Sequence, residues 1–144
     1  RNRMTQPLDG VRIIDLSSVV MGPFATQLLG DLGADVIKVE PPDGDILRHI
    51  APMKNPAMGH IYLHHNRNKR SIVLDLKKPE GLEALQKLLK TADVLFYNVR
   101  PQAMKRLKLS YEDVAAINPQ IIYVGAYGFS QRGPYAAQPA YDDL

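Results

Sequence analysis

Short apolar runs alternate with longer, more polar segments along the whole chain. The apolar runs predict five strands, at residues 11–15, 36–40, 71–76, 93–97 and 121–126. The segments between them predict helices that start near Pro23 and that cover residues 79–90, 102–107 and 111–117. Because strands and helices alternate, we expect an α/β domain built on a mainly parallel sheet.

Glycine and proline mark where several of these elements begin and end. Gly22 and Pro23 predict the start of the first helix, with the proline at its first position. Gly33 predicts the C-cap of that helix, whose apolar residues recur at helical spacing. The pair at residues 41–42, both proline, ends the second strand, and residues 43–59 are expected to be irregular.

The composition is ordinary for a globular domain. The chain has 144 residues, of which 45% are hydrophobic and 23% are charged, so one domain with a hydrophobic core is expected. There is no cysteine, which excludes a disulfide framework and thiolate chemistry. No run approaches the length of a membrane span and the first ten residues have no signal-peptide pattern, so we expect a cytoplasmic protein without a membrane partner.

Basic residues cluster in two places, although the net charge is only +3. The clusters are Arg67, Lys69, Arg70, Lys77 and Lys78, and then Arg100, Lys105, Arg106 and Lys108. Two interpretations remain open from the residues alone: two solvated surfaces, or a site for a phosphate-bearing ligand. A nucleic-acid partner is not expected, because no aromatic interleaving or known motif accompanies the charge.

The passage from the first strand to the first helix is the best place for a ligand, since ligands of open α/β sheets bind at the carboxyl ends of strands. Residues 16–23 contain one glycine and match neither a dinucleotide fingerprint nor a Walker A motif, which argues against a nicotinamide-dependent oxidoreductase. Ser17 and Ser18 have no nucleophile-elbow pattern and are expected to hydrogen-bond the following turn. Glu40 is interpreted as a solvated residue at a strand end.

The remaining candidates for chemistry are histidines and a pair of aspartates. His60 and His64 are four residues apart and could share a helix face, but acids are scarce around them and no metal site is expected. Asp142 and Asp143 are neighbours that would point to opposite faces of an extended segment, so they make a poor acid–base pair. These residues alone do not identify a reaction.

Three segments of the chain contain distinctive motifs in a fixed order. The first runs from an Asp-Leu strand end through Gly-Pro to LGDLGADVIKVE and a Gly-Asp pair, at residues 7–45. The second contains NRNKRS, LDLK and an Asn-x-x-Pro stretch, at residues 66–107. The third runs from a strand into GFSQRGP, before Tyr141 and Asp142. Taken in this order, the segments resemble family III (CaiB/BaiF-type) coenzyme A transferases, and the resemblance extends from about Pro7 to the last residue.

The resemblance implies a Rossmann-like fold with a mainly parallel sheet and flanking helices. Residues 7–144 would form a truncated N-terminal coenzyme A-binding domain, and residues 1–6 would be a tail or an expression remnant. The family adds a smaller second domain and forms an interlocked homodimer when full-length. Its catalytic aspartate would lie beyond Leu144, so no catalytic residue is assigned here. Tyr141 would lie near the active site, where the racemase branch has a histidine, which favours transfer over racemisation.

Motif positions imply where coenzyme A would bind. The implied contacts are Ser18, Val19, Val20, Arg70, Leu74, Lys77, Asn98, Val99 and Arg106. By the resemblance, the loop at residues 18–20 would lie near the thioester, Leu74 would pack near the adenine, and Lys77 would face the phosphates. Residues 98–106 would bind the nucleotide and the pantetheine. Some members have glutamine where this chain has Val20 and a basic residue where it has Pro41, and Val20 suggests a more apolar acyl group.

The implied activity is the transfer of coenzyme A between an acyl-CoA thioester and a small free carboxylic acid, through an acyl-aspartyl anhydride. Coenzyme A is then a substrate, and no metal is expected. Two alternatives stay open: an α-methylacyl-CoA racemase-type isomerase, and a coenzyme A-binding module without turnover. Backbone N–H groups at the start of the first helix are a candidate for stabilising oxyanion charge.

Overall fold

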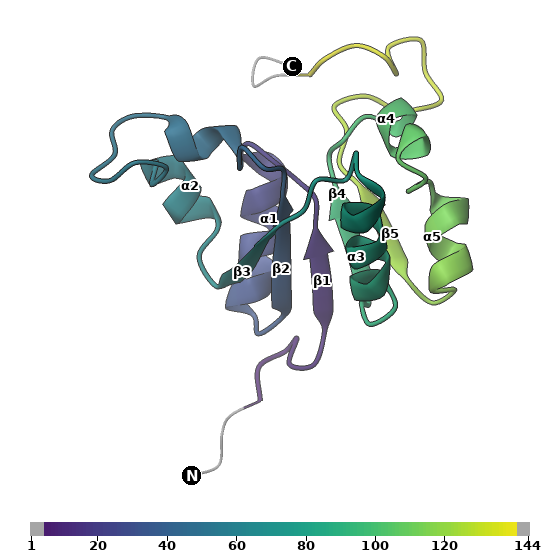
Figure 1. The fold of residues 1–144 in the computed structure, drawn as a ribbon, viewed down its shortest axis with the longest axis horizontal. Coiled ribbons are helices and arrows are strands. Elements are labelled where there is room, and N and C mark those ends of the chain that lie inside the picture. Colours follow the sequence, from purple (N-terminus) through teal and green to yellow (C-terminus); the bar gives the residue numbers. More distant parts are fainter. Residues whose placement is uncertain (1–4, 141–144) are drawn as a thin grey trace.

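The computed structural model describes residues 5–140, which form a five-stranded parallel sheet with helices on both faces (Figure 1). The strands are β1 (Arg12–Asp15), β2 (Asp35–Glu40), β3 (Lys69–Val73), β4 (Val94–Tyr97) and β5 (Ile122–Gly125). The helices are α1 (Met21–Asp31), the 3-10 helix η1 (Ile46–His49), α2 (His60–His65), α3 (Pro79–Leu89), α4 (Pro101–Arg106) and α5 (Tyr111–Ile117). The α/β fold with a parallel sheet is therefore confirmed.

The strand order, β3-β2-β1-β4-β5, places β1 at the centre. Ile14 on β1 is paired with Ile37 on β2 and with Leu95 on β4, so the chain leaves β1 toward one side of the sheet and later returns on the other. The order thus reverses between β1 and β4. In open α/β sheets the loops diverge at such a point and leave a crevice beyond the carboxyl ends of the strands.

Two apolar clusters hold the helices against opposite faces of the sheet. On one face, Ile14 and Leu95 pack with Leu85 and Leu89, which are the fully buried residues of α3. On the other face, Ile13 and Val36 form a smaller cluster with Leu29 of α1 and residues before β1. The amphipathic helix predicted at residues 79–90 is confirmed, and its leucines form part of the larger cluster.

Three local predictions need correction. The helix α1 begins at Met21, so Pro23 is its third residue and not its first. The strand β3 ends at Val73 and not at Leu76, because its pairing with β2 runs only from Val36–Lys69 to Glu40–Val73. The stretch that we expected to be irregular contains η1, which Asp45 caps by accepting a hydrogen bond from the Leu47 N–H.

The helix α1 turns polar side chains as well as Leu29 toward the sheet. Thr26 and Gln27 are buried, as are Gly22 and Pro23, whereas Phe24 and Leu28 remain more than 40% exposed. Within residues 5–140, no helix has both the length and the apolar character needed to cross a membrane.

Candidate functional site

A cavity of about 580 Å³ lies beyond the carboxyl ends of β1 and β2. Its walls come from the loop after β1, the turn between β2 and η1, the turn between β3 and α3, and helix α4. Four residues implied by motif position line it: Ser18, Leu74, Lys77 and Val99. Leu74 and Lys77 reach the cavity because β3 ends before them. The early end of that strand therefore has a direct consequence for the site.

A second cavity of about 450 Å³ adjoins the first and is strongly basic. The two share Leu76, Lys77 and Leu107, so they form one elongated depression. Of the residues between 5 and 140, four cationic side chains and no acidic one line the second cavity: Lys77, Lys78, Arg106 and Lys108. The ion pairs of the described residues include none with Lys77, Arg106 or Lys108. This depression suits an elongated ligand with a polyanionic end.

Local backbone structure places these cations. Lys108 follows the end of α4 in the left-handed conformation, with φ of 54°, and its N–H donates to the Lys105 carbonyl. The next N–H reaches back to Met104, which completes a helix C-cap of the Schellman type. Gly81 lets α3 begin against the backbone of Asp75, since a Cβ there would lie 2.2 Å from the Asp75 carbonyl oxygen.

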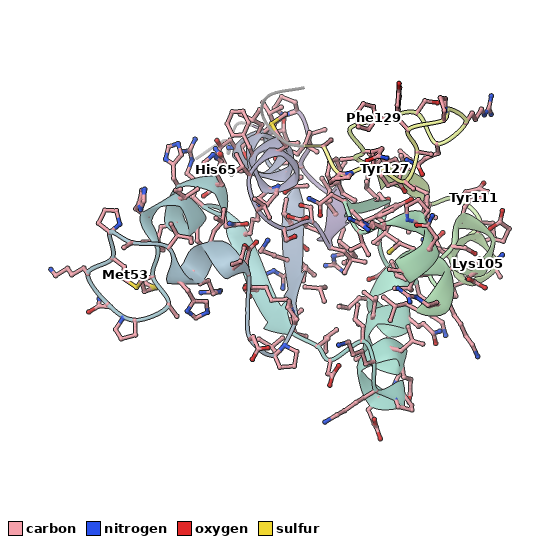
Figure 2. The ribbon with its side chains drawn as sticks, turned by 90° about the horizontal axis from the view of Figure 1, so that it is seen from above. Met53, His65, Lys105, Tyr111, Tyr127 and Phe129 are labelled. Carbon is pink, nitrogen blue, oxygen red and sulfur yellow. The ribbon has the colours of Figure 1, made fainter. Side chains whose placement is uncertain are left out.

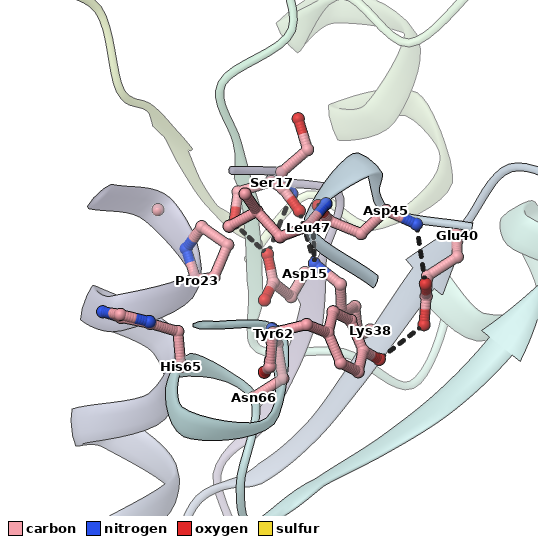
Figure 3. A network of polar contacts seen from close by, with 12 residues as sticks. Asp15, Ser17, Pro23, Lys38, Glu40, Asp45, Leu47, Tyr62, His65 and Asn66 are labelled. Carbon is pink, nitrogen blue, oxygen red and sulfur yellow. Dashed lines mark hydrogen bonds and ion pairs between the residues drawn. The ribbon is translucent and has the colours of Figure 1, made fainter. Parts of the chain in front are cut away.

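Buried charges underlie the loop after β1 (Figure 3). The Asp15 carboxylate accepts hydrogen bonds from the Ser17 backbone N–H (2.8 Å) and from the hydroxyls of Ser17 (2.5 Å) and Thr26 (2.6 Å). Lys69 completes the group at 2.9 Å from Asp15. Burial lowers the pKa of Lys69 below its usual value, although the negative charge of Asp15 opposes that shift. Ser17 thus bonds the strand behind it and not the following turn, which corrects its expected role.

A second buried ion pair ties β2 to the same loop. The ammonium group of Lys38 lies 3.0 Å from the carboxylate of Asp45, and both side chains are 1% exposed. The same ammonium donates to the Ser17 carbonyl oxygen at 2.8 Å. Through these contacts Ser17 is held from both its side chain and its backbone, so the floor of the cavity is a rigid polar layer (Figure 3).

Glu40 is not the solvated strand-end residue that the sequence suggested; it is only 1% exposed. Its carboxylate accepts hydrogen bonds from Arg48 (2.7 Å from both Nε and Nη2), from the Tyr62 hydroxyl (2.8 Å) and from the Ser71 hydroxyl (2.6 Å). Burial raises the pKa of Glu40, but these bonds and one from the Asp45 N–H outweigh it and lower the pKa to about 2. Burial and this carboxylate raise the pKa of Tyr62.

Four of the other five residues implied by motif position lie in three different settings. Arg70 is not at the cavity: its guanidinium binds the Asp35 carboxylate at 2.6 and 2.7 Å, near the opposite end of β2. Arg106 lines the second cavity, apart from Val99 in the first. Val19 and Val20 belong to the loop after β1 but are absent from the walls of both cavities.

The side chain of Asn98 is already engaged within the protein. Its Oδ1 accepts a hydrogen bond from the Ser18 N–H at 3.0 Å, and its Nδ2 donates to the Ser18 carbonyl oxygen at 2.9 Å. The Ser18 backbone therefore hydrogen-bonds the Asn98 side chain and not the following turn, which corrects the expectation for Ser18. Tyr141, which is expected near the active site, and the neighbouring aspartates Asp142 and Asp143 lie outside the described residues.

The histidines do not converge on one site. His60 contacts the Pro52 carbonyl oxygen through Nδ1 at 3.1 Å, and His64 packs its ring edge-on against His65. His65 in turn packs against Phe24 at the outer side of α1, where Figure 2 shows it at the edge of the fold. Between residues 5 and 140, no group of three or more histidine, aspartate or glutamate side chains is placed to hold a metal ion.

Comparison with known proteins decides the family. The sequence profile of CoA-transferase family III matches residues 8–144, which is nearly the whole chain. The chain belongs to this family. The resemblance that three segments of the sequence indicated is therefore confirmed over one continuous stretch.

Relatives within the family are similar throughout this region. A succinate–glutarate CoA-transferase of Agrobacterium fabrum is 45% identical over 143 residues, covering 94% of this chain and 36% of its own length. An acetyl-CoA:oxalate CoA-transferase of Acetobacter aceti is 45% identical, covering 96% of this chain and 36% of its own. The crystal structure of a CAIB/BAIF family protein from Brucella suis superposes with a TM-score of 0.90 at 41% identity, covering 97% of this chain and 38% of that one. The chain thus spans about a third of the length of these relatives.

Proposed function

We propose that the full-length protein transfers coenzyme A between an acyl-CoA thioester and a free carboxylate, and that residues 7–144 form its coenzyme A-binding domain. The single observation that carries the proposal is the pair of adjoining cavities at the carboxyl edge of the sheet in a member of this family. One cavity is large and mostly apolar in its lining, and the other is basic. Coenzyme A combines the same two properties, a long neutral pantetheine and a polyanionic nucleotide.

The two cavities suggest a direction for the bound molecule. Lys77 and Arg106 would contact the phosphates, because both are free of ion pairs with the described acids and both line the basic cavity. Val99 would contact the pantetheine in the larger cavity. Leu74 lines that cavity too, so the adenine that motif position puts beside it would lie where the two cavities meet. The acyl end would then point toward Ser18 and the loop after β1. Binding energy from the nucleotide, remote from the reacting atoms, would position the thioester.

The chemistry we propose is covalent. A carboxylate contributed by the chain beyond Leu144 attacks the thioester carbonyl carbon, the carbon–sulfur bond breaks, and the coenzyme A leaves as a thiolate. The thiolate then attacks the aspartyl carbonyl of the resulting acyl-aspartyl anhydride and releases the donor acid, which leaves an enzyme-bound coenzyme A thioester. The acceptor carboxylate attacks that thioester and displaces the thiolate to form a second anhydride. Attack of the thiolate on the acyl carbonyl of this anhydride gives the new acyl-CoA and restores the enzyme carboxylate. The described residues would contribute oxyanion stabilisation: Val20 precedes α1 without a side-chain cap, which leaves N–H groups of Met21 and Gly22 for a ligand.

Mass spectrometry on the full-length protein in deuterated water tests the reaction. Acyl-CoA donors are offered with free succinate, glutarate and oxalate, the acids in the names of similar proteins. A new coenzyme A ester without deuterium at its α-carbon supports transfer. Deuterium entering the original acyl-CoA without acyl exchange would instead identify a racemase-type isomerase. Binding of coenzyme A with neither outcome would identify a binding module without turnover.

Matched variants test the binding mode. Lys77→Ala and Arg106→Ala are each expected to weaken coenzyme A binding by about tenfold, because each removes a charged partner of phosphate. Lys87→Ala is the control: that lysine is exposed on α3 and pairs with Glu83 at 2.8 Å, away from both cavities. If Lys77→Ala and Arg106→Ala bind coenzyme A as tightly as Lys87→Ala does, the proposed placement of the phosphates is overturned. We also propose that the full-length protein is a cytoplasmic, interlocked homodimer. Light scattering of the full-length protein tests the dimeric state.

A further inference from the structure

The loop after β1 contains a backbone conformation that its sequence does not favour. Val19 has a φ of 70°, in the left-handed region. A β-branched residue is strongly disfavoured there, because its side chain crowds the backbone. Val19 is also 45% exposed, so burial of its own side chain provides little compensation. Neighbouring contacts must therefore impose the conformation, and such outliers concentrate at functional loops.

Both flanks of Val19 are fixed. On the N-terminal side, Ser17 is held by Asp15 and by Lys38, as described above. On the C-terminal side, α1 begins at Met21, and its second residue, Gly22, sits directly against Ser17. A Cβ at Gly22 would lie 2.4 Å from the Ser17 Cβ. The chain therefore has only Ser18, Val19 and Val20 in which to connect two rigid supports.

The side chain of Asn98 contacts the first residue of that connection. It pairs with both backbone polar groups of Ser18, with distances of 3.0 and 2.9 Å, in the manner of a neighbouring strand. Asn98 directly follows β4, and Ser18 follows β1, the strand that pairs with β4. The last backbone hydrogen bond between these two chain segments runs from the Leu16 N–H to the Phe96 carbonyl oxygen at 2.8 Å. The carboxamide thus extends the ladder past the strand ends, at the point where the strand order reverses.

We propose that Asn98 is a positioning residue, which clamps Ser18 and thereby keeps Val19 in the left-handed conformation that presents the 18–20 loop to the acyl end of coenzyme A. The proposal rests on the proposed function. Motif position implied that Asn98 contacts coenzyme A. We give Asn98 a different role, because its Oδ1 and its Nδ2 both hydrogen-bond the backbone of Ser18. Without the clamp, Val19 relaxes to negative φ and the loop leaves its place at the crevice.

A rescue experiment in the full-length protein tests the clamp. Asn98→Ala is expected to lower kcat for coenzyme A transfer by about tenfold to a hundredfold, with less than about threefold change in coenzyme A affinity. Adding Val19→Gly to that variant is expected to restore most of kcat, because glycine adopts positive φ without penalty. A direct ligand contact by Asn98 predicts the opposite: lost affinity that Val19→Gly does not restore. That result, or an unchanged kcat in Asn98→Ala, would overturn the proposal.

Asn118→Ala is the matched control. Asn118 also uses its carboxamide to hold backbone, donating to the carbonyls of Leu89 (3.0 Å) and Ala92 (2.8 Å), but it follows α5 and lines neither cavity. It is expected to lower Tm without changing kcat. If it lowers kcat as much as Asn98→Ala does, the effect is general destabilisation and the clamp is not needed to explain it.

Failure of the proposed function is distinguishable from failure of the clamp. If the wild-type protein neither binds coenzyme A nor transfers it, the proposed function fails. Hydrogen exchange of the amides at residues 18–20 then still reports on the clamp, because Asn98→Ala should expose the Ser18 N–H and speed its exchange. Exchange at the wild-type rate in that variant would show that Asn98 does not hold the loop.

Discussion

The buried carboxylate of Glu40 provides a quantitative prediction about stability. Its pKa is about 2 in the folded protein, against 4.5 for an unperturbed glutamate. At about 1.4 kcal/mol for each pKa unit, the charged form stabilises the fold by on the order of 3 kcal/mol at neutral pH. Because the folded pKa is the lower one, this contribution is complete above pH 4.5 and is lost as the pH falls toward 2. About half of it should be gone near pH 3.

The perturbation is Glu40→Gln, which keeps the shape of the side chain and removes its charge. At pH 7 the variant should lose about 3 kcal/mol of unfolding free energy relative to the wild type, since Arg48 then lacks its carboxylate partner in a buried site. Near pH 3 the difference between the two proteins should shrink to about 1 or 2 kcal/mol. Urea denaturation of the full-length protein at several pH values measures both quantities.

Glu83→Gln is the control for this experiment. Glu83 is an exposed glutamate on α3 that pairs with Lys87, one helical turn away, so its substitution should leave stability nearly unchanged at every pH. A Glu40→Gln difference that stays constant between pH 3 and pH 7 would refute the reasoning. It would mean that the charge of Glu40 is not stabilised by the hydrogen bonds of Arg48, Tyr62 and Ser71.

Two further predictions concern α1. Gly22→Ala should destabilise the protein by about 2 kcal/mol, because the new Cβ would overlap Ser17. Gly133→Ala should have little effect, because its new Cβ would lie 3.6 Å from the Ser130 carbonyl oxygen, an ordinary contact; thermal denaturation compares the two variants. The 144-residue polypeptide should bind an apolar dye through the exposed side of α1, and replacing Phe24 and Leu28 together by serine should reduce that binding; unchanged fluorescence would count against this surface.

The sequence alone allowed most of the sheet and its larger core to be predicted, because those elements follow local patterns. The leucines of α3 recur at helical spacing, and they are the residues that cover the sheet. The end of β3 was wrong by three residues, since pairing with β2 decides where that strand stops, and pairing is not local information. That difference matters for the site because it turns Leu74 and Lys77 into loop residues.

Buried polar contacts were beyond prediction for the same reason. The partners of Glu40 are 8, 22 and 31 positions away in the sequence, at Arg48, Tyr62 and Ser71, and no spacing rule connects them. Lys69 and Arg70 looked like members of one basic cluster that could meet a phosphate. In the fold they bind Asp15 and Asp35, on different strands, so only the later lysines of that cluster reach the cavities.

Helix α1 shows why apolar spacing predicts a helix without fixing the side that it buries. A surface helix ordinarily covers the sheet with its apolar stripe. Here the sheet beneath it contains the buried pair of Asp15 and Lys69, and a buried charge is costly unless it is fully hydrogen-bonded. Thr26 donates to Asp15 at 2.6 Å, and the carbonyl of Pro23 accepts from Lys69 at 2.9 Å. An apolar side chain in place of Thr26 would leave Asp15 short of a partner, so the charges under the loop help to set the orientation of the helix, together with Leu29, which packs on Ile13 and Val36.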